Sequence, residues 1–149
     1  MRLIANLDSS RHGHIFGHIH CKQFTHPKPI HFIVDTGCST TTLLSSDVTR
    51  LGINCSVLTN TTHPCTTANG NVLPYCLPDA KLFLEVENGW LTHKKEIASF
   101  SLQMIYCMPP NPNPLTPIQS MQAYSLLGMN FLYFFKKWKY NDTELILET

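Results

Sequence analysis

Apolar and polar residues alternate along much of the chain, which is the pattern of half-buried β-strands. The alternation is clear over residues 15–21 and leads, through a turn, into the apolar run 30–34. Further strands are expected over residues 72–77, 81–87 and 90–108, the last two joined by an Asn88-Gly89 hairpin turn. The pattern therefore predicts a mostly β protein.

Helical patterns are few and short. One covers residues 47–51, where Ser45 or Ser46 can cap the helix and Gly52 can end it. A second short helical pattern follows Gly128. One or two short helices are thus expected beside the strands.

A proline-rich stretch near residues 108–119 holds five of the ten prolines and cannot pair in a sheet. It is expected to be an exposed loop. A length of 149 residues suits one domain with its own hydrophobic core, so residues 1–149 are expected to form a single domain and the stretch to be an insertion.

Candidate chemistry comes where the run Phe32-Ile33-Val34 ends in Asp35-Thr36-Gly37. The apolar triplet favours a buried strand, and the next three residues leave it, so a carboxylate is presented at the end of the sheet. Gly37 allows another backbone or a ligand to approach closely. The alternative is that Asp35 only caps a turn, a common role for this triplet.

Later in the chain, Leu126-Leu127-Gly128 supplies two apolar residues and a glycine. The two segments together resemble the retropepsin-like aspartic proteases, in which such a triplet packs beneath the catalytic loop. The resemblance runs from about residue 15 to the end. It is closest to cellular domains of the DNA-damage-inducible protein type, whose subunits end in a helix and a hairpin, here expected over 131–137 and 138–147. It implies a closed β-barrel of the acid protease fold.

The resemblance makes Asp35 the catalytic residue and Thr36, Gly37, Leu127 and Gly128 its structural support. No second Asp-Thr-Gly or Asp-Ser-Gly occurs in the sequence. A working site would therefore need Asp35 from each of two subunits, related by a twofold axis in a homodimer.

A cover for the substrate is expected at residues 66–72, where Asn69-Gly70 is typical of a hairpin tip. The family places its flap at this position, so the resemblance assigns Ala68, Asn69, Gly70 and Asn71 to substrate binding. Ordinary surface hairpins have the same pattern. A flap would hold an extended peptide or protein substrate through main-chain hydrogen bonds.

The implied function is that of an aspartic endopeptidase. Two carboxylates held about 3 Å apart share one proton, so that one acts as general base on water and the other as general acid. The alternative is a catalytically inactive domain of the same fold, used for dimerisation or peptide binding. The intact Asp35-Thr36-Gly37 triplet favours the enzyme.

Charge and cysteine content exclude several other classes. The net charge is +1 and no cluster of Lys and Arg forms a nucleic-acid surface. No stretch approaches 18 apolar residues and the first residues do not form a signal peptide, so a cytoplasmic protein without membrane contact is expected. The six cysteines show no Cys-x-x-Cys spacing and are expected to be free thiols. Cys38 places an oxidisable thiol next to Gly37.

The histidines offer a competing hypothesis. His12 and His14, like His18 and His20, would point to the same face of a strand, as in some zinc sites. No nearby cysteine or carboxylate motif completes such a site, so surface histidines, no metal and no cofactor are expected.

Asn130 stands where the family often has Asp and sometimes Asn.

Overall fold

The computed structural model describes residues 1–67, 70–89, 94–110 and 124–149. Its helical elements are α1 (Ser45–Leu51), the 3-10 helix η1 (Cys55–Val57) and α3 (Met129–Leu132). Its strands are β1 (Arg2–Leu7), β2 (Gly13–His20), β3 (Lys28–Val34), β4 (Thr42–Leu43), β5 (Thr59–Asn60), β6 (Cys65–Thr67), β7 (Gly70–Val72), β8 (Tyr75–Asn88), β9 (Lys94–Cys107), β10 (Ser125–Leu127), β11 (Lys137–Tyr140) and β12 (Glu144–Glu148).

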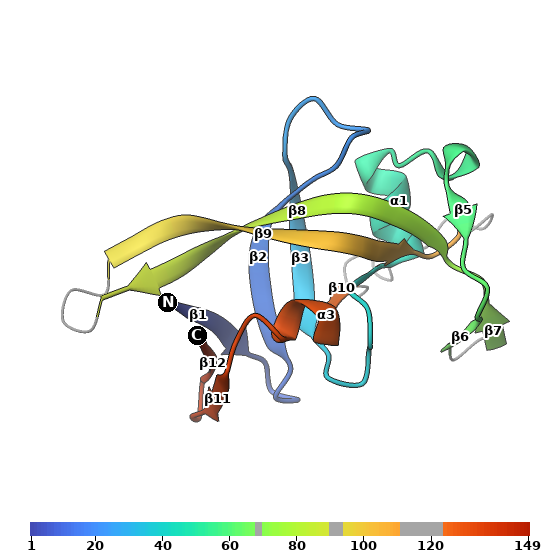
Figure 1. Ribbon diagram of the computed structural model, residues 1–149. Helices are drawn as coiled ribbons and strands as arrows, with labels where there is room; N and C mark the ends of the chain where they lie inside the picture. Colours follow the sequence, from blue (N-terminus) through green and yellow to red (C-terminus); the bar gives the residue numbers. More distant parts are fainter. Residues whose placement is uncertain (68–69, 90–93, 111–123) are drawn as a thin grey trace.

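Ten of these strands form one curved sheet in the order β11-β12-β1-β2-β3-β10-β4-β9-β8-β5. The long strands β8 and β9 cross the molecule, and β8 also pairs with β1 and β2, so the sheet folds back on itself (Figure 1). Because β11 and β5 remain at its ends, the sheet is not a formally closed barrel. The expected mostly β class with few, short helices is confirmed, whereas the expected closed barrel is not.

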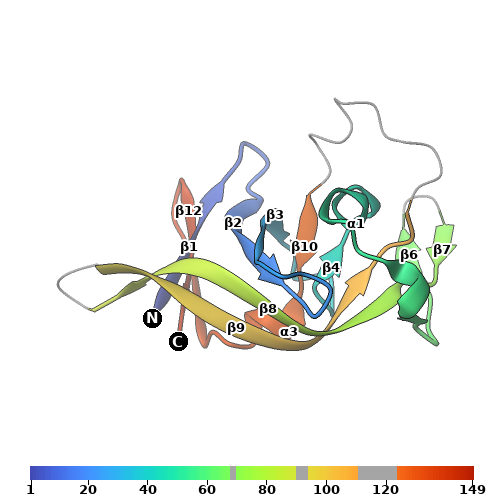
Figure 2. The same ribbon diagram turned by 90° about the horizontal axis from the view of Figure 1, so that it is seen from above.

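Both ends of the chain belong to this sheet. β1 pairs with β12 in antiparallel register, with Leu3 opposite Leu147, and Figure 2 shows the two termini side by side. The strand pattern of β1 was not recognised in the sequence, although Leu3 and Ala5 alternate at period two and are both buried. The first and last strands thus share the core with the strand that leads to Asp35.

Helix α1 lies where the sequence predicts a helix, but its N-cap is not one of the two predicted serines. The N-cap position is Leu44, which makes no side-chain capping bond. Ser45 instead donates its hydroxyl to the carbonyl of Pro109 at 2.6 Å, a tertiary contact that the local sequence does not indicate. Gly52 ends the helix as expected, in a left-handed conformation with φ of 72°.

The helix expected over 131–137 is shorter and begins earlier, as α3. Phe135 is buried, and the N–H of Lys136 donates to the carbonyl of Glu148 at 2.8 Å, so the chain leaves the helix to begin the terminal hairpin. That hairpin, β11–β12, is found where it was expected. No helix in the described part of the chain is long and apolar enough to span a membrane.

The strands expected over 72–77 and 81–87 are divided differently. Val72 belongs to the short β7, and one strand, β8, runs from Tyr75 to Asn88 without ending at Pro78. Continuous pairing with β9 on both sides of this point keeps the strand intact. Residues 90–93 and most of the expected proline-rich loop, 111–119, lie outside the described residues.

A buried polar network attaches α1 to β10. Ser125 is fully buried and donates its hydroxyl to the carboxylate of Asp47 at 2.6 Å. The same hydroxyl oxygen accepts the N–H of Leu44 at 3.1 Å. Arg50 donates to the other carboxylate oxygen of Asp47 at 2.8 Å, so the buried charge is paired.

We expect Ser125→Ala to lower the free energy of unfolding by about 2 kcal/mol, because the Oδ2 atom of Asp47 and the N–H of Leu44 lose their hydrogen-bond partner, while Arg50 still pairs with Oδ1 of Asp47. Urea denaturation followed by circular dichroism measures the change. Ser99→Ala is the matched control, since Ser99 is exposed on β9, and should change the value by less than about 0.5 kcal/mol. Equal losses in the two variants would contradict the role given to Ser125.

Candidate active site

Asp35 lies directly after β3, where the strand leaves the sheet. Its backbone N–H donates to the carbonyl of Leu127 at the end of β10, at 3.0 Å. Its carboxylate accepts the N–H of Gly37 at 2.8 Å. The side chain is partly exposed, so the carboxylate is held by backbone groups and still reachable from outside.

The position of β10 explains why the chain turns here. β10 lies between β3, to which it is parallel, and β4, to which it is antiparallel. The segment from Asp35 to Thr41 must therefore pass around the end of β10. At that end Leu127 and Gly128 are both buried beneath the loop.

Gly128 is the closest contact between the two segments. A Cβ atom added to it would lie 2.7 Å from the carbonyl oxygen of Cys38 and 2.6 Å from the carbonyl carbon of Thr40. The N–H of Met129 then donates to the carbonyl of Cys38 at 2.8 Å. Only glycine allows the backbone of the loop to rest directly on this segment.

Asn130 and Thr41 hold the loop from the other side. The side-chain oxygen of Asn130 accepts the N–H of Thr41 at 2.7 Å and its hydroxyl at 2.8 Å. The Thr41 oxygen accepts the N–H of Gly128 at 3.2 Å, and the Asn130 amide donates to Met104 on β9 at 3.1 Å. The sequence does not single out Thr41, because its neighbours Thr40 and Thr42 are the same residue type and only the fold places Thr41 against Asn130 and Gly128.

Cys38 contributes hydrogen bonds within the same loop. Its thiol donates to the carbonyl of Thr40 at 2.9 Å and lies 3.5 Å from the hydroxyl of Thr42. The thiol therefore faces into the loop on the side of β4. All six cysteines of the chain are unpaired.

The residues assigned to the flap are only partly described. Ala68 and Asn69 lie outside the described residues, whereas Gly70 and Asn71 are exposed on β7, which pairs with β6 in a two-stranded hairpin. Burial raises the pKa of the Cys65 thiol on β6, and the Cys38 thiol of the loop after Asp35 raises it further.

The described part of the chain supplies one carboxylate, that of Asp35, to the loop after β3. Thr36 and Gly37 are exposed beside Asp35, and no other described carboxylate is hydrogen-bonded to it. The loop thus presents one partly exposed carboxylate, that of Asp35, among the described residues.

Comparisons with known proteins agree with this geometry. A family model described as aspartyl protease matches residues 22–84, which include Asp35 and the β6–β7 hairpin. The crystal structure of a retropepsin-like aspartic protease from Rickettsia conorii superimposes with a TM-score of 0.59 and 23% identity, over 99% of this chain and 98% of that one. No curated protein matches the chain. The findings establish a retropepsin-like fold and support the aspartyl protease family.

We expect Asn130→Ala to lower the free energy of unfolding by about 2 kcal/mol or more, because the fully buried Thr41 loses the acceptor of its N–H and hydroxyl. Asn130→Asp retains that acceptor and should lose less than half as much. Urea denaturation at neutral pH compares the two variants. If both lose the same amount, the bonds to Thr41 are not what Asn130 contributes.

Proposed function

We propose that the chain is an aspartic endopeptidase of the retropepsin-like family. The observation that carries the proposal is the backbone bond from Asp35 to Leu127, which presents a carboxylate on a loop supported by Gly128. A turn residue would not need this support from a segment about 90 residues away. Pairing of β1 and β12 with the same sheet further favours one catalytic domain over residues 1–149.

The proposed reaction uses Asp35 from each of two subunits. One carboxylate accepts a proton from water as it attacks the peptide carbonyl, and the other, protonated, donates to the carbonyl oxygen. The pair shares one proton, so titration belongs to the pair, and activity should fall on the alkaline side as that proton is lost. Gly37 donates its N–H to the carboxylate, and Thr36, which is exposed beside it, is proposed to brace the loop of the second subunit.

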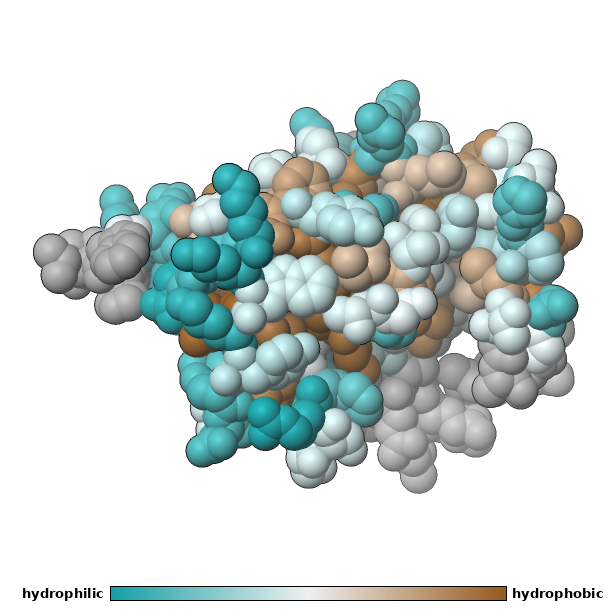
Figure 3. All heavy atoms as spheres, turned by 60° about the horizontal axis from the view of Figure 1, so that its bottom comes forward, coloured by the Kyte–Doolittle hydropathy of each residue, from teal (hydrophilic) through white to brown (hydrophobic). Residues whose placement is uncertain are grey.

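The second subunit is proposed to be another copy of this chain. Aromatic side chains are exposed after α3 and on the edge strand β11, with Tyr133 at 77% and Tyr140 at 55%. Figure 3 shows this side of the molecule, where hydrophobic residues extend across the middle and hydrophilic residues gather toward the end with the chain termini. An edge strand flanked by exposed aromatic rings is suited to an interface between copies.

The substrate is proposed to be a peptide or protein segment in extended conformation. The β6–β7 hairpin is a separate two-stranded sheet, whose backbone is suited to pair with such a segment. Hydrophobic side chains on both sides of the cleaved bond are expected. The terminal hairpin β11–β12 after α3 is the feature that favours the cellular DNA-damage-inducible type.

We expect Asp35→Asn to reduce peptide cleavage by at least about 1000-fold, because an amide cannot act as the shared acid and base. Cleavage of a peptide library by the purified chain at several pH values provides the measurement. Asp142→Asn, an exposed carboxylate in the terminal hairpin, is the control and should remain active. A folded wild-type dimer without activity would instead favour the inactive, peptide-binding alternative.

We expect Tyr140→Glu to raise the dimer dissociation constant about tenfold or more, because a charge replaces an aromatic side chain at the proposed interface. Peptidase activity at low protein concentration should fall in parallel. Val57→Glu, an exposed apolar position on η1, should leave both unchanged in sedimentation and activity measurements. A fully active monomer would contradict the dimer.

A further inference from the structure

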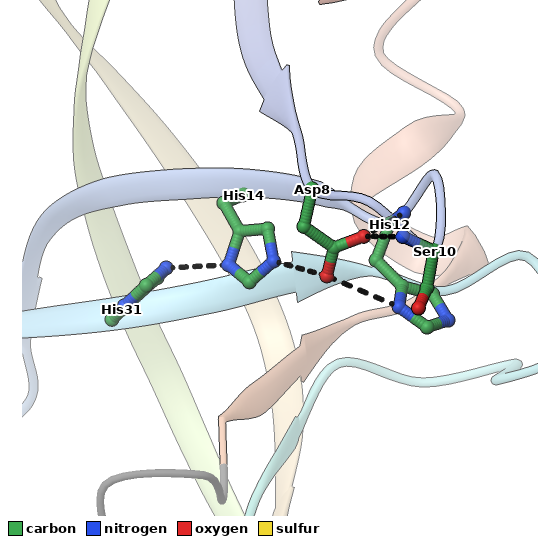
Figure 4. A network of polar contacts seen from close by, with 5 residues as sticks. All are labelled: Asp8, Ser10, His12, His14 and His31. Atoms are coloured by element: carbon green, nitrogen blue, oxygen red, sulfur yellow. Dashed lines mark hydrogen bonds and ion pairs between the residues drawn. The ribbon is translucent and has the colours of Figure 1, made fainter.

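Two histidines, His12 and His14, contact the Asp8 carboxylate, and a third, His31, contacts His14 from the neighbouring strand (Figure 4). The Nε2 atom of His14 lies 2.9 Å from the Asp8 carboxylate, and its Nδ1 atom lies 2.9 Å from Nε2 of His31. His12 is a more distant neighbour of the same carboxylate, at 3.3 Å. Contrary to the expected surface histidines, the His14 side chain is only 15% exposed.

The geometry limits the number of protons on the His14–His31 pair. An ionised carboxylate only accepts hydrogen bonds, so Nε2 of His14 carries a hydrogen. If His14 is neutral, its Nδ1 atom accepts a hydrogen from His31; if it is charged, its Nδ1–H donates to a neutral His31. Either way the pair holds one positive charge at most, and a second proton removes the bond between the rings.

The network connects the turn after β1 with strands β2 and β3. Asp8 accepts the backbone N–H groups of Ser10 and His12 at 2.8 and 2.9 Å, and so organises the turn between β1 and β2. His14 lies on β2 and His31 on β3, four residues before Asp35. β1 pairs with the terminal strand β12, so the network lies between the terminal strands and the strand that carries Asp35.

The surroundings favour the singly charged state. His31 is stacked between Phe16 and Tyr124, with ring centroids 3.8 and 4.3 Å away. Burial lowers the pKa of His31, the charge on His14 lowers it further, and the carboxylate of Asp47 on α1 opposes both. Arg50, His18 and Glu85 share a cavity of about 550 Å³ with His31. The bond from His14 holds the pKa of Asp8 well below its usual range.

We propose that Asp8, His14 and His31 form a proton-sensitive latch, which ties the β1–β2 turn to β3 and opens when the histidine pair binds a second proton. The direction in which stability changes with pH follows from the number of protons that the folded and the unfolded chain bind. Because the pKa of His31 is lowered in the folded chain, the unfolded chain binds more protons just below the ordinary histidine pKa. Stability is therefore complete above that range and falls as the pH drops through it.

The test compares wild type, His31→Gln and His26→Gln by urea denaturation between about pH 5 and 7. Gln at position 31 can still donate to Nδ1 of His14 but does not titrate. We expect the slope of the unfolding free energy against pH to shrink by as much as one proton in His31→Gln. His26→Gln should keep the wild-type slope, because His26 is exposed in the connection between β2 and β3 and does not line the cavity with His31.

Nitrogen-15 NMR of the histidine rings in wild type tests the latch without any substitution. We expect Nε2 of His14 to be protonated throughout and the two rings to titrate as a coupled pair. An unchanged slope in His31→Gln, or independent titration of the two rings, would overturn the proposal. Displacement of the shared proton by one equivalent of Zn²⁺ would also overturn the proposal, because it would indicate a metal site. No readout requires peptidase activity, so this proposal and the proposed function can fail separately.

Discussion

The hydrogen bond from the Asp35 N–H to the Leu127 carbonyl is the contact on which the candidate site depends. It exists because β10 lies between β3 and β4, which forces the intervening chain around its end. The loop then rests on Gly128, where a side chain would collide with backbone atoms. Position and accessibility of the carboxylate both follow from this one arrangement of three short strands.

Neutral hydrogen bonds, rather than ion pairs, hold this arrangement. Asn130, Thr41 and the thiol of Cys38 satisfy the loop from within, using donors and acceptors that carry no charge. Buried neutral groups cost less to desolvate than buried charges, and each is paired here. Asp35 is thereby left as the charged side chain of the loop, which suits a group that must exchange protons.

Two titratable groups with different roles lie on β3 or directly after it. Asp35 follows its end on an accessible loop, whereas His31 lies within the strand and bonds to a neighbouring histidine. The first arrangement gives half of a proposed catalytic pair, which a second subunit would complete. The second is complete within one chain, because β1, β2 and β3 bring its three members together.

Local alternation and turn residues were enough to predict the mostly β class and the end of a strand before Asp35. The packing of Leu127 and Gly128 beneath that loop and the terminal hairpin were implied by the resemblance to a family, which two short motifs carry. Tertiary contacts decided the rest. Ser45 bonds to Pro109 instead of capping α1, the N–H of Lys136 bonds to Glu148 at the start of the terminal hairpin, and His14 bonds to Asp8 and to His31 on the neighbouring strand. Each partner is distant in sequence or lies on another strand, so no local pattern could specify it.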